Sequence, residues 1–268
     1  MLNATPHVKA EKCRFLGLLT LNRPQALNAL DHDMVRALTA QLHAWATDEN
    51  IKTVAIRGEG ARAFCAGGDI RAVQQAVAAG SDAGLAFLRD EYCMNALIAA
   101  YPKPYIALVH GICMGGGAGV SVHGRYRLAD ETLSFAMPET GIGFFPDIGS
   151  SYFLSRLPDE MGMYLALTGS AIGLADALAL ELLTPAVARE KFDAVMEGLA
   201  RGEDFAPFVR KREAGKLAAN RKHIATAFSA GSVEAILERL DRDGGDFARD
   251  TARTIRTRSP RPLDCRPR

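Results

Sequence analysis

Two glycine-rich turns constrain the fold of this chain more than any other feature of its sequence. One turn, at residues 63–69, contains Gly68, and the other, at residues 111–119, contains Gly116. Each follows a strand-like apolar run and precedes a helix-like run. A chain that enters a helix in this way leaves backbone N–H groups without intrahelical partners. Two such junctions can direct two N–H groups at one carbonyl oxygen, which is the arrangement of an oxyanion hole.

Each glycine turn taken alone is also compatible with a purely structural role. Gly115, Gly116 and Gly117 would equally suit close packing or a flexible turn. No G-x-G-x-x-G opens a helix there with an acidic residue at the right distance, so a dinucleotide site is not indicated. No Gly-Lys-Ser or Gly-Lys-Thr occurs, which excludes a P-loop.

The alternation of strands and helices predicts an α/β fold with crossover connections. Strands are expected at residues 15–21, 53–57, 104–109, 125–129 and 133–136, and helices at 31–47, 70–79, 85–100 and 116–123. From about residue 158 onward the pattern is nearly all helical. We therefore expect an α/β core with the active site at residues 1–185, a helical region at 186–258 and a disordered basic tail at 259–268.

Two acidic residues follow the second glycine turn. Glu139 has Met137, Ile142 and Phe144 as near neighbours, and Asp147 lies in the same apolar stretch. Removing a carboxylate from water raises its pKa toward the range used for proton transfer. A solvated loop remains an alternative for Glu139, and an N-cap of a helix near residue 148 remains one for Asp147. Glu91 has the pattern of an ordinary helix acid.

The other candidate nucleophiles and metal ligands are weaker. Ser121 and His123 are two residues apart, so on a helix they face different directions, and the segment lacks a full G-x-S-x-G elbow. Cys65 and Cys113 have no histidine near in sequence and are typical of small packing residues. The six histidines show no metal-ligand spacing. We expect neither a metal nor a cofactor.

Composition excludes several classes of partner. The 268-residue chain is 48% hydrophobic and 24% charged, with a net charge of +1, which gives no global basic field for nucleic acid. Seven arginines lie between residues 249 and 268, and they alone give little support for nucleic-acid binding. No uninterrupted apolar window is long enough for a membrane span. An odd number of cysteines without C-x-x-C pairs, and an N-terminus without a presequence pattern, predict a cytoplasmic location.

With these turns and acids, the chain resembles the crotonase (enoyl-CoA hydratase/isomerase) superfamily. Residues 19–30, 63–69 and 115–117 support this resemblance. Within the superfamily the chain is most similar to 3-hydroxyisobutyryl-CoA hydrolases, on the evidence of residues 115–124 and 135–147. The family implies a spiral of ββα units and an acyl-CoA thioester substrate, with CoA as part of the substrate. A homo-oligomer is also possible.

The resemblance assigns roles to individual residues. It implies an oxyanion hole at the backbone N–H groups of Gly68 and Gly116, with Glu139 as the catalytic glutamate and Asp147 as a second acid. It also implies substrate-binding positions at Glu91, Ala26, Ala66, Asp69 and Ile70.

Position 119 separates two chemistries within the family. Hydratases generally place the first of their two catalytic glutamates just after the glycine run, and here that residue is Gly119. We therefore expect hydrolysis of a short-chain 3-hydroxyacyl-CoA, specifically 3-hydroxyisobutyryl-CoA to 3-hydroxyisobutyrate and CoA in valine degradation. Glu139 acts either as the nucleophile or as the general base. The alternatives are an enoyl-CoA hydratase or isomerase, and a relative that binds acyl-CoA without turnover.

The C-terminal region departs from the family pattern. Residues 251–260 resemble the start of a segment that normally continues into further helices, whereas residues 261–268 show no apolar periodicity. The expectation is a truncated helical region that ends in the basic tail.

Overall fold

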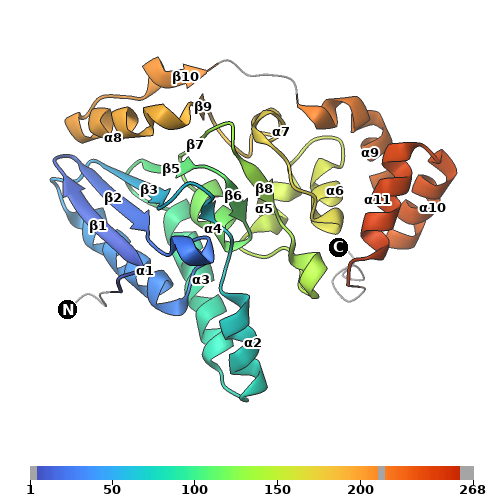
Figure 1. Ribbon diagram of the computed structural model, residues 1–268, viewed down its shortest axis with the longest axis horizontal. Coiled ribbons are helices and arrows are strands. Elements are labelled where there is room, and N and C mark those ends of the chain that lie inside the picture. The colour runs from blue at the N-terminus through green and yellow to red at the C-terminus, as the bar shows by residue number, and fades with distance from the viewer. Residues whose placement is uncertain (1–4, 211–214, 260–268) are drawn as a thin grey trace.

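The computed structural model describes residues 5–210 and 215–259 (Figure 1). Its strands form a seven-stranded sheet, in the order β1-β2-β3-β5-β7-β9-β10, and a three-stranded sheet, in the order β4-β6-β8. The bounds of the strands are β1 Val8–Cys13, β2 Leu16–Leu21, β3 Thr53–Gly58, β4 Ala63–Cys65, β5 Tyr105–Val109, β6 Ile112–Met114, β7 Tyr126–Ala129, β8 Ser134–Ala136, β9 Ala186–Val187 and β10 Val209–Arg210.

The α-helices lie between and after these strands. Their bounds are α1 His32–Thr47, α2 Ile70–Ala78, α3 Ala83–Ala99, α4 Gly116–Val122, α5 Ser150–Leu154, α6 Met161–Thr168, α7 Leu174–Ala179, α8 Phe192–Arg201, α9 Arg221–Phe228, α10 Val233–Asp243 and α11 Asp246–Arg256. None of the helices in residues 5–210 and 215–259 is long and apolar enough to cross a bilayer.

A repeated strand–strand–helix unit generates the two sheets. In the pairs β3/β4, β5/β6 and β7/β8, the first strand joins the large sheet and the second joins the small one. Helices α2 and α3 follow β4, and α4 follows β6. Corresponding strands of successive units pair in parallel in both sheets. This is the predicted spiral of ββα units, and it brings the ends of β4 and β6 side by side.

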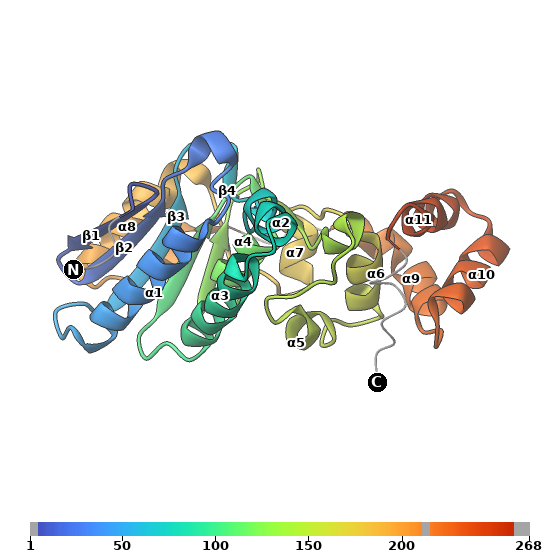
Figure 2. The ribbon, with the colours of Figure 1, turned by 90° about the horizontal axis from the view of Figure 1, so that it is seen from below.

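Strand β2 is buried along its whole length because helices cover both faces of the large sheet (Figure 2). Side chains alternate across a strand, so Leu16 and Leu18 pack with α8, while Leu19 and Leu21 pack with α1. On the α1 side Gly17 leaves room for Trp45, since a Cβ at position 17 would come within 2.5 Å of the indole ring.

Local signals in the sequence account for most elements of the core. Asp31 caps α1, as its side chain accepts a hydrogen bond from the Met34 N–H at 2.8 Å. Strand β1 was not predicted. Its residues are mostly exposed, and it pairs antiparallel with β2 at the edge of the sheet. An edge strand with charged side chains has no apolar run by which to identify it.

The C-terminal part is mostly helical. Helices α9, α10 and α11 lie together at the end of the molecule far from β1, and they pack beside α6 (Figures 1 and 2). Strands β9 and β10 add to the large sheet next to β7, so this sheet continues past the predicted boundary at residue 185. The predicted tail at 259–268 lies outside the described residues except for Ser259.

Candidate active site

The two glycine turns meet directly after the paired strands β4 and β6. A Cβ built on Gly116 would lie 3.1 Å from the Gly68 nitrogen, so the two amide positions are neighbours. In each turn the preceding glycine has a positive φ, +116° at Gly67 and +48° at Gly115. L side chains rarely adopt these conformations, which explains why glycine occupies both positions.

The fold leaves both of these amides free. Within residues 5–210 and 215–259, the Gly68 and Gly116 N–H groups donate no hydrogen bond. Gly116 is the first residue of α4, where an N–H has no intrahelical acceptor. Two free and adjacent N–H groups can polarise a carbonyl oxygen and stabilise the charge that develops on it.

Two buried glutamates border these amides. Glu91 on α3 is 3% exposed and Glu139 is 7% exposed, and each has a carboxylate oxygen without a hydrogen-bond partner in the described part of the chain. A Cβ on Gly116 would overlap Glu91 Oε1, and one on Gly115 would lie 2.9 Å from Glu139 Oε1. Both carboxyl groups therefore lie beside the turns that carry the free amides.

Burial sets the ionisation of these glutamates. Desolvation, with Asp147 nearby, raises the pKa of Glu139 to about 8. Desolvation together with Asp147 and Glu139 raises the pKa of Glu91 to about 8 as well. Near neutral pH the cluster therefore retains protons that exposed glutamates would have lost.

Asp147 is the third acid of the cluster. Desolvation raises its pKa, and the Tyr92 hydroxyl opposes this by donating a hydrogen bond to Asp147 Oδ2 at 2.7 Å. Asp147 is not a helix N-cap, because α5 begins at Ser150 with Gly149 as its cap. Only its backbone carbonyl contributes there, accepting from the Ser150 N–H at 2.8 Å.

His123 supports the turn after Asp147 instead of pairing with a serine. Its Nε2 lies 2.7 Å from the Ile148 carbonyl oxygen, which only accepts, so Nε2 carries the proton. Ile148 has a φ of +47°, a strained conformation for a β-branched residue. The Ser121 hydroxyl donates to the Gly117 carbonyl at 2.9 Å. The structure therefore contradicts a Ser121–His123 pair.

The remaining predicted substrate positions lie on neighbouring loops. Ala66 N–H donates to the Leu27 carbonyl at 3.0 Å, which joins the loop of Ala26 to the first glycine turn. Asp69 caps α2 and pairs with Arg23 Nη1 at 2.8 Å, so its carboxylate already has structural partners. Ile70 begins α2 and is 45% exposed.

The two cysteines near the glycine turns are fully buried. Burial raises the pKa of the Cys113 thiol to about 12 and also raises the pKa of the Cys65 thiol. Thiols in this state are poor nucleophiles. Among the described residues, no group of three or more His, Cys, Asp or Glu side chains is placed to hold a metal ion.

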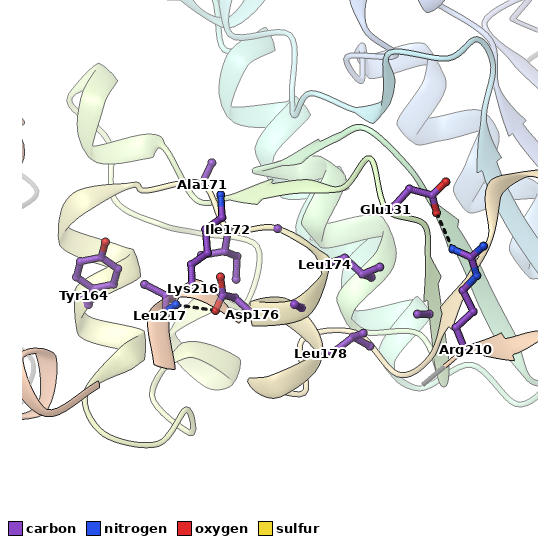
Figure 3. Close-up of a pocket in the computed structure, with 13 residues that line it drawn as sticks. Glu131, Tyr164, Ala171, Ile172, Leu174, Asp176, Leu178, Arg210, Lys216 and Leu217 are labelled. Carbon is purple, nitrogen blue, oxygen red and sulfur yellow. Dashed lines mark hydrogen bonds and ion pairs between the residues drawn. The ribbon is translucent and has the colours of Figure 1, made fainter. Parts of the chain in front are cut away.

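A cavity of about 410 Å³ adjoins Asp147. Its lining residues are Tyr92, Asn95, Ala96, Ala99, His123, Phe145, Pro146, Asp147, Ile148, Gly149 and Ser151. A larger cavity of about 510 Å³ lies elsewhere and shares no lining residue with this one (Figure 3). In the larger cavity Asp176 accepts from the Leu217 N–H, and Arg210 contacts Glu131. We therefore assign the candidate active site to the acids, not to the larger cavity.

Comparison with known proteins decides the family. The enoyl-CoA hydratase/isomerase family model matches residues 16–266. The chain belongs to the enoyl-CoA hydratase/isomerase family. One relative, 3-hydroxyisobutyryl-CoA hydrolase from Xenopus tropicalis, is 45% identical to this chain over 92% of this chain and 68% of its own length. The Homo sapiens hydrolase of the same name is 40% identical over 97% of this chain and 71% of its own length.

A solved structure of the family has the same fold. A carnitinyl-CoA dehydratase from Mycobacterium thermoresistibile superposes with a TM-score of 0.93 at 37% identity, over 96% of this chain and 76% of that one. Both hydrolases are named as mitochondrial, which contradicts the expected cytoplasmic location. A cellular address is not part of the catalytic fold, so overall composition and cysteine spacing could not indicate it.

Two polar residues of the site, Asn95 and Tyr92, were not identified from the sequence. Asn95 lies one turn after Glu91 on α3, and both belong to the buried face of that helix. A Cβ at Gly119 would lie 2.9 Å from Asn95 Nδ2, so Asn95 occupies the space beside position 119. The i, i+4 spacing from Glu91 is the signal that could have identified it. Tyr92 had no such signal.

The stability of the protein is expected to depend on pH through Glu91. Its pKa is about 8 in the folded protein and 4.5 ordinarily, so between these values the unfolded chain ionises first. The contribution of Glu91 to stability is thus fully present below pH 4.5 and is lost as the pH rises through 8. Thermal melts should show that the Tm of Glu91→Gln relative to wild type rises across this range.

Glu59 provides a control of the opposite sign. A hydrogen bond from Lys9 lowers the pKa of Glu59, so this group contributes stability above its ordinary pKa. The Tm of Glu59→Gln relative to wild type should therefore fall as the pH rises through the acidic range. A Tm difference for Glu91→Gln that does not change with pH would contradict a raised pKa at Glu91.

Proposed function

We propose that this protein hydrolyses 3-hydroxyisobutyryl-CoA to 3-hydroxyisobutyrate and CoA, a reaction of valine degradation. The observation that carries the proposal is the pair of free, adjacent amides at Gly68 and Gly116 with the buried carboxyl group of Glu139 beside them. The site alone does not define the acyl group. The proposed acyl group comes from the names of the relatives, which are 3-hydroxyisobutyryl-CoA hydrolases. The proposed reaction consumes only water and the thioester, and we propose that it proceeds without a metal or cofactor.

The thioester oxygen binds between the Gly68 and Gly116 N–H groups in this proposal. Attack on the carbonyl carbon places negative charge on that oxygen, and the two amides stabilise it without reorganising. Helix α4 also directs its N-terminus toward this oxygen, since Gly116 is its first residue. The position of these donors is fixed by the fold before substrate binds.

Glu139 performs the covalent or proton-transfer step. As a nucleophile it attacks the thioester carbon to form an anhydride, the C–S bond breaks, and water then releases the acid. As a general base it removes a proton from a water that attacks the same carbon. Both routes require the ionised carboxylate, and both end with a proton on the sulfur of CoA.

The other acids and the loop residues bind the substrate. Asp147 orients the acyl hydroxyl or Glu139, and Glu91 holds the acyl group beside the amides. The CoA chain follows the surface near Ala26, Ala66, Asp69 and Ile70. Ala66 is bonded to the loop of Ala26 through Leu27, which supports one continuous binding surface.

Addition of water to an enoyl-CoA is the second candidate function. The dehydratase and hydratase names of solved structures favour it. Gly119 argues against it, because a second proton-transfer acid is absent at that position and Asn95 fills the adjacent space. Thioester hydrolysis requires no acid there.

A thiol-release assay tests the proposal. Purified protein is mixed with 3-hydroxyisobutyryl-CoA, and free CoA is followed with a thiol reagent, with 3-hydroxypropionyl-CoA and crotonyl-CoA in parallel. We expect hydrolysis of the 3-hydroxyisobutyryl thioester with kcat above about 1 s⁻¹. Loss of crotonyl-CoA absorbance without thiol release would identify a hydratase. Tight binding without either reaction would identify a non-catalytic acyl-CoA binder.

A further inference from the structure

The side chain of Asn95 is buried without any hydrogen-bond partner. The residue is 5% exposed, and neither Nδ2 nor Oδ1 is paired within the part of the chain that the structure describes. Buried amides are nearly always paired, since an unsatisfied donor or acceptor has lost its hydration without compensation. A polar group kept in this state at an active site indicates a ligand that completes its hydrogen bonds.

The position of Asn95 limits what that ligand is. The residue contributes to the wall of the cavity of about 410 Å³ that also contains Asp147. Its helix, α3, packs against α4, and the amide lies beside Gly119 of α4. Glu91, one turn earlier on the same face of α3, lies beside Gly116. Helix α3 thus places two polar side chains along α4: Glu91 beside the free amides, and Asn95 one turn further along.

The spacing between these positions suits a substituted acyl chain. Gly119 comes three positions after Gly116, which corresponds to a rise of about 4.5 Å along the helix. The Gly116 N–H points out of the N-terminal end of α4, and a Cβ at Gly119 tilts toward the same end, so the Asn95 amide that meets this Cβ lies on the side of the helix where the acyl chain binds. A hydroxyl group there can accept from Asn95 Nδ2 and donate to Asn95 Oδ1 or to the Asp147 carboxylate.

We propose that Asn95 binds the 3-hydroxyl group of the acyl chain and so makes the site selective for 3-hydroxyacyl thioesters over their unsubstituted analogues. The proposal rests on the proposed function, because it takes the thioester to be bound at Gly68 and Gly116. Selectivity follows because an acyl chain without the hydroxyl leaves the buried amide unpaired. Sites built to pair a substrate hydroxyl discriminate strongly for this reason.

The kinetic test compares 3-hydroxyisobutyryl-CoA with isobutyryl-CoA for wild type and Asn95→Leu. Leucine has nearly the same shape as asparagine and no donor or acceptor. Wild type is expected to prefer the hydroxylated thioester, and Asn95→Leu should reduce the ratio of the two kcat/KM values by at least about tenfold. Equal losses for both substrates, or an unchanged ratio, would overturn the proposal.

Thermal stability without ligand provides a readout independent of activity. Replacing an unpaired buried amide with an apolar group should leave the Tm of Asn95→Leu equal to or above that of wild type. Asn28 is the matched control, because it is fully buried and its amide donates to the Glu59 and Ala63 carbonyls at 3.0 and 2.9 Å. Asn28→Leu should lower the Tm, because it removes these hydrogen bonds and because leucine disfavours the left-handed backbone of position 28, where φ is +56°. An equal decrease for Asn95→Leu would assign Asn95 a structural role and overturn the proposal.

Failure of the proposed function gives a different result from failure of this inference. A wild type that cleaves both thioesters with equal kcat/KM retains the hydrolase function and overturns selectivity at Asn95. A wild type that releases no thiol overturns the hydrolase function. In that case Kd values replace kcat/KM for the same two thioesters. The inference then requires that wild type binds the hydroxylated thioester more tightly and that Asn95→Leu reduces this preference by at least about tenfold; an unchanged preference would overturn it.

Discussion

Glu139→Gln is expected to lower kcat for 3-hydroxyisobutyryl-CoA hydrolysis by about 10²- to 10⁴-fold, the range for loss of a positioned acid–base group. Glutamine preserves the shape of the side chain but cannot ionise, so neither the nucleophilic nor the general-base route remains. Glu139 is 7% exposed, and its pKa of about 8 reflects that burial. Thiol release under saturating substrate measures the effect.

Thermal melting provides the control for this variant. Replacing a buried ionisable group with a neutral one should not lower the Tm at pH 8, so a large loss of kcat with an unchanged Tm identifies a chemical role. Mass spectrometry of wild type quenched during turnover separates the two routes, since only nucleophilic attack leaves an acyl adduct on Glu139. Wild-type kcat in Glu139→Gln would contradict both routes.

Gly116→Ala is expected to lower kcat by about 10²- to 10³-fold, comparable to the loss of one oxyanion-hole donor. The added Cβ would lie 3.1 Å from the Gly68 nitrogen and would overlap Glu91 Oε1, so it fills the space proposed for the thioester oxygen. The backbone tolerates the change, because alanine is favourable in a helix and Gly116 does not have a positive φ.

Gly231→Ala is the matched control for this prediction. A Cβ at Gly231 would have no atom within 4 Å, and the residue lies among the C-terminal helices, between α9 and α10. This variant should keep kcat within about twofold of wild type, as is usual for surface substitutions. If Gly116→Ala also retained wild-type kcat, the amides at positions 68 and 116 could not bind the reacting oxygen.

The sequence predicted those parts of the fold that depend on local patterns. Apolar runs located β2, β3 and β5, and the Asp31 cap located the start of α1. A raised pKa was also predicted for Glu139, and its burial raises the pKa to about 8; of the apolar neighbours that indicated it, Met137 is buried, whereas Ile142 is 60% exposed. For the strands and the cap of α1, the physical cause lies within a few residues along the chain.

The parts that were not predicted depend on contacts between distant segments. The burial of Glu91 and Asn95 arises from packing of α3 against α4. Their i, i+4 spacing places them on one face of a helix, but it does not show that this face is buried. The hydrogen bond from Tyr92 to Asp147 joins residues 55 positions apart. Asp147 was compatible with an N-cap in sequence, but the left-handed Gly149 takes that position.

A crystal structure of Glu139→Gln with 3-hydroxyisobutyryl-CoA tests the central claim most directly, because the variant should bind the thioester and cleave it slowly. We predict the thioester oxygen at about 2.9 Å from both the Gly68 and Gly116 nitrogens, with the carbonyl carbon facing the side chain at position 139. A thioester oxygen that contacts neither amide, in a fully occupied ligand, would contradict acyl-thioester cleavage at this site.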